Sequence, residues 1–144
     1  MYLWTVHVTG PSQAATKLFF SAQFWVIAAA IWTTAVLALA LSPDTRTAWL
    51  VKTLGDKLIH ALAFAGGAIV WVRALQTSAR LNLTLAMAAG SVVVLLVGAA
   101  IELLQSYVPT RSSDVRDFVA DLLGVLFALL CLAIGRALRP KARV

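Results

Sequence analysis

Four long apolar runs, separated by short polar segments, dominate the sequence. They extend over residues 18–41, 58–75, 83–107 and 115–138. Each run approaches or exceeds the roughly 20 apolar residues that an α-helix needs to cross the hydrocarbon layer of a bilayer. The segments between the runs contain Pro, Ser, Thr and Asp, which are typical of turns and helix caps. The pattern therefore predicts four transmembrane helices joined by short loops.

The two ends of the chain differ from the apolar runs. Residues 1–16 have a mixed composition with a Gly-Pro-Ser break, and residues 141–144 are short and basic. We expect a tail at each end and a single transmembrane domain over residues 17–140. The first apolar run is far longer than the roughly 7–15 residues of a signal-peptide core, so we interpret it as a retained helix.

The overall composition supports a membrane protein and argues against a soluble domain. Of the 144 residues, 61% are hydrophobic and 12% are charged, whereas soluble domains are about half apolar and about a quarter charged. The mean hydropathy is +0.89. We therefore expect an all-α fold, namely an integral membrane bundle of four helices. Its expected partner is the lipid bilayer that surrounds it.

The net charge of +6 does not indicate a nucleic-acid partner. The basic residues stand singly between the apolar runs, without the basic stripe interleaved with aromatic residues that nucleic acid requires. Such residues are typical of loops beside lipid headgroups. With both chain ends on one side of the membrane, that side has seven Lys and Arg residues and the other side has five. This excess predicts that both termini are cytoplasmic.

Acidic residues are distributed unevenly between the two ends of the predicted helices. All six of them fall in the outer loops or in the adjacent helix ends, and His60 lies at the same end. The inner ends have only Lys and Arg as charged residues. Acidic groups contribute little to the orientation of helices, so this distribution needs another explanation.

Helical spacing places polar residues on one face of each of three helices. The aligned pairs are Asp56 and His60, Glu102 and Gln105, and Asp117 and Asp121. At about 1.5 Å per residue, Glu102 and Asp121 each lie about 9 Å below the outer helix ends. A carboxylate that faces lipid at this depth is costly. We therefore predict that the three faces meet inside the bundle in one polar cluster.

The sequence leaves open how the two deep carboxylates are compensated. Candidate partners for Glu102 and Asp121 are Lys57, His60, Gln105 and Arg111, and the two carboxylates could instead share one proton. Polar residues near helix ends also cap helices and pair across a bundle without any further role. Small residues are expected to let the helices approach closely, namely Gly66, Gly67, Gly90 and Gly98.

Three segments of the sequence share a pattern of polar residues at helix ends. The first is Asp56-Lys57-Leu58-Ile59-His60 with Phe64, and the second is Glu102-Leu103-Leu104-Gln105. The third is Arg111, Asp117, Asp121 and Gly124. In this order and at these intervals, the three segments resemble the VanZ-like family of bacterial membrane proteins. Asp121 departs from the family pattern, in which Asn is commoner at this position. The resemblance covers about residues 56–130.

The resemblance implies a multi-pass protein of the bacterial cytoplasmic membrane with a role in the cell envelope. The family is named for an accessory protein of glycopeptide-antibiotic resistance, and the resemblance implies no particular reaction. We expect a lipid-linked or anionic envelope ligand at the outer leaflet, and no cofactor. The expected site residues are Asp56 as helix cap and charge partner, Lys57 and Arg111 as cations, His60 as proton donor or acceptor, and Glu102, Gln105, Asp117 and Asp121 as acceptors.

Two other functions remain open at this point. The first is a membrane-embedded enzyme, because His60 and the carboxylates are suitable for acid/base chemistry or for a divalent metal. However, the sequence has no HExxH motif, no Ser or Cys beside His60 and no Gly-rich phosphate loop, so we expect no metal site. The second is a proton or solute carrier, although the inner helix halves contain no acidic residue or His to continue a relay.

Overall fold

The computed structural model describes residues 21–42, 54–108 and 114–138, and within these ranges it contains α-helices and no strand. The helices are α2 (Ala22–Ala40), α4 (Asp56–Ser78), α5 (Leu83–Gln105) and α6 (Val115–Ala137). All four are long and apolar enough to cross a membrane. The predicted all-α membrane bundle of four helices is therefore confirmed, whereas the two predicted tails lie outside the described residues.

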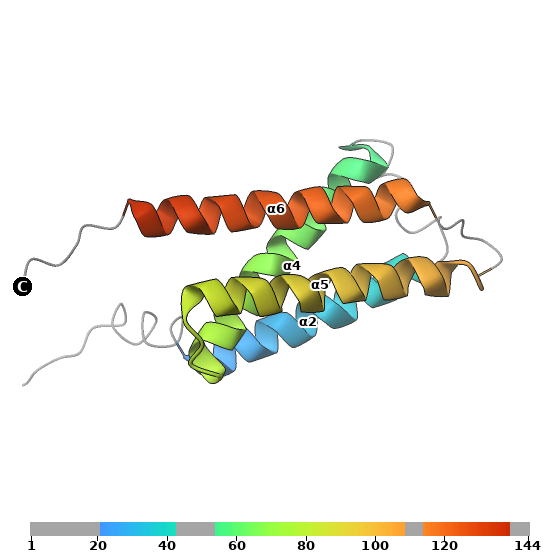
Figure 1. The fold of residues 1–144 in the computed structure, drawn as a ribbon. Helices are drawn as coiled ribbons and strands as arrows, with labels where there is room; N and C mark the ends of the chain where they lie inside the picture. Colours follow the sequence, from blue (N-terminus) through green and yellow to red (C-terminus); the bar gives the residue numbers. More distant parts are fainter. Residues whose placement is uncertain (1–20, 43–53, 109–113, 139–144) are drawn as a thin grey trace, which may run out of the picture.

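Helix α4 is the central helix of the bundle. It packs against α2, α5 and α6, whereas α2 and α6 form no contact with each other among the described residues. Figure 1 shows α4 running obliquely between α6 and the pair formed by α2 and α5. Side chains on different faces of α4 therefore reach three different neighbours.

One end of the bundle collects the helix termini that bear the acidic residues. Helices α2 and α5 end there, and helices α4 and α6 begin there (Figure 1). We call it the polar end. Because helix N-termini carry partial positive charge, two of the four helices present a favourable environment for carboxylates at this end.

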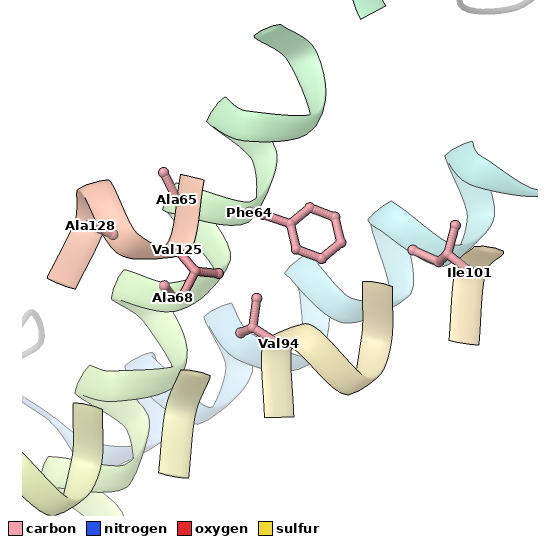
Figure 2. Packing of buried hydrophobic residues seen from close by; sticks show 7 residues of the cluster. All are labelled: Phe64, Ala65, Ala68, Val94, Ile101, Val125 and Ala128. Atoms are coloured by element: carbon pink, nitrogen blue, oxygen red, sulfur yellow. The ribbon is translucent and has the colours of Figure 1, made fainter. Parts of the chain in front are cut away.

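The apolar core is small and consists mainly of short side chains. Its members are Phe64, Ala65, Ala68, Val94, Ile101, Val125 and Ala128 (Figure 2). Large side chains instead lie on the outside, as for Leu96, which is 64% exposed, and Phe127, which is 63% exposed. In a membrane such side chains contact lipid, and helices associate through close packing of small residues.

Glycines on α4, α5 and α6 allow this close approach. A Cβ atom on Gly67 would overlap the ring of Trp32, and one on Gly124 would overlap the backbone of Ala61. The Trp32 Nε1–H also donates a hydrogen bond of 2.9 Å to the carbonyl oxygen of Ala63, which ties α2 to α4. Gly66 has open space around it, so its predicted packing role is wrong: it faces away from these contacts.

Candidate functional site

The first turn of α4 begins the polar cluster. Its N-cap is Gly55, whose φ of 81° lies in the left-handed region that favours glycine. Asp56 is the first residue of the helix, so its predicted role as the cap is wrong, because the chain turns one residue earlier. The carboxylate still lies in the first helical turn, where it interacts favourably with the helix dipole.

Lys57 is surrounded by three carboxylates from two helices. Its Nζ atom lies 3.1 Å from Asp56 Oδ2 and 3.2 Å from Asp114 Oδ2, and it also forms an ion pair with Asp117 Oδ1. The side chain of Lys57 is 45% exposed, whereas that of Asp117 is 10% exposed. The ammonium group therefore lies at the exposed edge of the cluster and offsets the charge of the buried Asp117 carboxylate.

Asp114 joins the start of α6 to the end of α5. It is the N-cap of α6, and its Oδ1 atom accepts a 2.9 Å hydrogen bond from the backbone N–H of Arg116. Its own backbone N–H donates to Glu102 Oε2 at 2.9 Å. The Arg116 N–H and, next in importance, the Lys57 ammonium lower the pKa of the Asp114 carboxyl below its ordinary value.

His60 and Asp121 form the deepest polar contact. His60 Nδ1 lies 2.9 Å from Asp121 Oδ1, and the Asp121 side chain is 1% exposed. When Asp121 is ionised, its carboxylate can only accept hydrogen bonds, and the Nδ1–H of His60 is then the donor. His60 Nε2 is then directed elsewhere, 3.9 Å from Asp117 Oδ2.

Two neighbours shape the space around Asp121. A Cβ atom on Gly98 would lie 2.8 Å from Asp121 Oδ2, so only a glycine on α5 allows the carboxylate this position. The ring of Phe64 stacks on His60 with 6.5 Å between ring centroids and an interplanar angle of 10°. The pair is therefore held between an apolar ring and a close helix backbone.

The remaining predicted site residues are arranged differently. Gln105 is 5% exposed, and its Nε2–H donates a 3.0 Å hydrogen bond to the carbonyl oxygen of Ala40 at the end of α2. Its Oε1 atom has no partner among the described residues. Arg111 lies outside the described residues. Gln105 therefore ties α5 to the carbonyl of Ala40, which ends α2 and has no partner within its own helix. It acts as a donor there and does not form the predicted acceptor pair with Glu102.

The two deep carboxylates have different hydrogen-bond partners. Asp121 pairs with His60, and Glu102 accepts from the backbone of Asp114. Each carboxylate is therefore compensated by its own partner, and the described contacts do not include a proton shared between Glu102 and Asp121. Three helices nevertheless contribute to one cluster, because α4, α5 and α6 each provide a charged side chain at the polar end.

Asp114 is the cluster member that the expected site lacked. The sequence did contain a sign of its involvement, because Asp114 lies directly before α6 and three residues before Asp117. Acidic residues in such positions are common helix caps, so the position of Asp114 alone did not predict a contact with Lys57. Only the packing of α4 against α6 makes this contact possible.

The cluster is strongly acidic. Among the described residues it contains the carboxylates of Asp56, Glu102, Asp114, Asp117 and Asp121, together with Lys57 and His60. One donor atom each of Asp56, His60 and Asp117 lies within 4.8 Å of the others. Such a set can exchange protons, accept hydrogen bonds from a ligand or bind a cation.

Comparisons with known proteins give no relative. No protein-family model, curated protein or solved structure matches this chain. The interpretation of the polar end therefore depends on its own geometry, and the resemblance to the VanZ-like family stays a prediction from three short segments.

Proposed function

We propose that this chain is a VanZ-like multi-pass protein of the bacterial cytoplasmic membrane that binds a lipid-linked envelope ligand at its polar end. The observation that carries the proposal is the contact of Lys57 and His60 on α4 with the carboxylates of α6. Ionisable groups within a membrane-spanning bundle are costly and generally serve a function.

A purely structural role explains this cluster less well. Replacing a buried ion pair by apolar residues of similar volume is often neutral or stabilising, so stability alone does not require one. The bundle already packs through glycines and a small apolar core. The cluster also brings together residues from all three segments that resemble the VanZ-like family, which supports a common role for them.

The proposed orientation places the polar end at the outer leaflet. It follows from the excess of Lys and Arg on the side that has both termini. The described acceptors favour a ligand with hydroxyl or amino groups. An anionic group on the same ligand would need basic residues of the neighbouring loops, and Arg111 is the predicted one.

Glycopeptide sensitivity tests this function. We expect expression of the chain in a susceptible bacterium to change its sensitivity to a glycopeptide antibiotic, and His60→Ala and Asp121→Ala to abolish the change. Leu96→Ala is the matched control, because Leu96 faces outward. No change with the wild-type chain, or an undiminished change with both cluster variants at equal membrane levels, would contradict the proposal.

The contact between His60 and Asp121 favours a second candidate, an acid/base enzyme. A buried carboxylate that fixes the imidazole leaves Nε2 to take up or release a proton, as in many hydrolases. Purified protein in lipid nanodiscs should then hydrolyse a lipid-linked phosphate or a glycolipid, and His60→Ala should stop the reaction. Absence of hydrolysis by the wild-type chain would exclude the enzyme, and hydrolysis that persists in His60→Ala would exclude His60 as its acid or base.

A further inference from the structure

We propose that Asp56, His60 and Asp117 bind a divalent metal ion, with Lys57 as the internal cation that the ion displaces. The donors come from the first two turns of α4 and the first turn of α6, and one ligand atom of each lies within 4.8 Å of the others. This inference goes beyond the proposed function, because a metal can bind here whether or not an envelope ligand does.

The orientation of His60 distinguishes this site from an acidic patch. Metal-binding histidines generally donate their second ring N–H to a carboxylate, which fixes the tautomer and the ring. Asp121 provides that carboxylate at 2.9 Å from Nδ1, and it is 1% exposed. The lone pair of Nε2 is thereby kept for a ligand on the side of Asp117, 3.9 Å away.

The charge of the cluster also indicates a cation. Four carboxylates, those of Asp56, Asp114, Asp117 and Asp121, face one ammonium group and one imidazole among the described residues. The side chain of Asp117 is only 10% exposed, so its charge must be offset by a neighbour. Lys57 already occupies this position, which shows that the carboxylates accept a positive charge between them.

Lys57 can leave when an ion arrives. Its side chain is 45% exposed and has a flexible four-carbon stem, so it can keep its contact with Asp114 and release Asp117. One imidazole nitrogen and two carboxylates form a mixed set that suits Zn²⁺ or Mn²⁺ better than Mg²⁺ or Ca²⁺, which prefer oxygen ligands alone.

Metal titration of the full chain tests the inference. The protein, without a histidine tag and in lipid nanodiscs, is titrated with Zn²⁺ and with Mn²⁺ by calorimetry. We expect one ion per chain. Lys57→Met should bind at least about tenfold more tightly, because a like charge beside the ion is removed. Lys57→Arg keeps the charge and should show no such gain.

Loss variants complete the experiment. His60→Ala and Asp117→Asn should lose the ion, whereas Glu102→Gln removes a carboxylate of the cluster outside the donor set and should keep one ion per chain. Absence of a stoichiometric ion in both the wild-type and the Lys57→Met proteins would overturn the inference. Binding that His60→Ala and Asp117→Asn leave intact would overturn it too. Tighter metal binding by Lys57→Met cannot result from misfolding. None of these results depends on glycopeptide sensitivity, so this test and that of the proposed function can fail independently.

Discussion

His60 Nδ1 lies 2.9 Å from a carboxylate oxygen of Asp121, although 61 positions separate the two residues along the chain. The contact joins α4 to α6 at the most buried point of the polar end. It depends on close helix packing, because Gly98 leaves room for the Asp121 carboxylate and Gly124 lies directly against the backbone of Ala61. The contact between the charged residues therefore depends on the glycines that let the helices approach.

We first predict that Gly124→Ala destabilises the protein. The new Cβ would overlap the carbonyl of Ala61, and since backbone atoms cannot rotate away, α4 and α6 must separate. Overpacking of this kind costs about 1–3 kcal/mol. The free energy of unfolding, measured by denaturant titration in mixed micelles, should fall by such an amount.

Gly135→Ala on the same helix is the matched control for this prediction. A Cβ there meets nothing within 4 Å, so the free energy of unfolding should stay the same or rise slightly, since alanine favours helix over glycine. Equal losses in both variants would show that α6 does not approach α4 as described.

We also predict that Asp114 makes stability depend on pH under acidic conditions. Its pKa in the folded chain lies below the ordinary value of 3.8, because the Arg116 N–H and the Lys57 ammonium favour the ionised form. The resulting stabilisation is complete above that ordinary value and is lost as the pH falls through the folded pKa. Asp114→Asn keeps a capping side chain without the charge.

The comparison of wild type with Asp114→Asn isolates this effect. The wild type should have the larger free energy of unfolding at about pH 6, and the difference should shrink as the pH falls below 3.8 and the carboxyl is protonated. A difference that stays constant over this range, or grows as the pH falls, would contradict the stabilising role of the Asp114 charge.

The sequence predicted the helices well because the bilayer imposes their length. The run at 58–75 became Asp56–Ser78, and the run at 115–138 became Val115–Ala137. Small shifts occur at the ends, where capping decides the boundary: Gly55 starts α4 earlier than hydropathy indicates. Apolar periodicity and length are strong signals in lipid, where the backbone must satisfy its own hydrogen bonds.

The polar cluster could be predicted only in part. Helical spacing identified the faces that bear His60 and Asp121, but it could not predict which residue of one helix meets which residue of another. That pairing depends on the crossing of α4 and α6 and on their relative rotation. The same limit explains Gln105, which shares a face with Glu102 in the sequence but donates its hydrogen bond to Ala40 of α2.

A double-mutant cycle on His60 and Asp121 tests the central claim most directly. The free energy of unfolding is measured for the wild type, His60→Ala, Asp121→Ala and the double variant in the same lipid or micelle. If α4 and α6 meet through this buried pair, the two substitutions are coupled by about 1 kcal/mol or more. Effects that add to within about 0.5 kcal/mol would show that the two side chains do not meet, and the account of the polar end would be wrong.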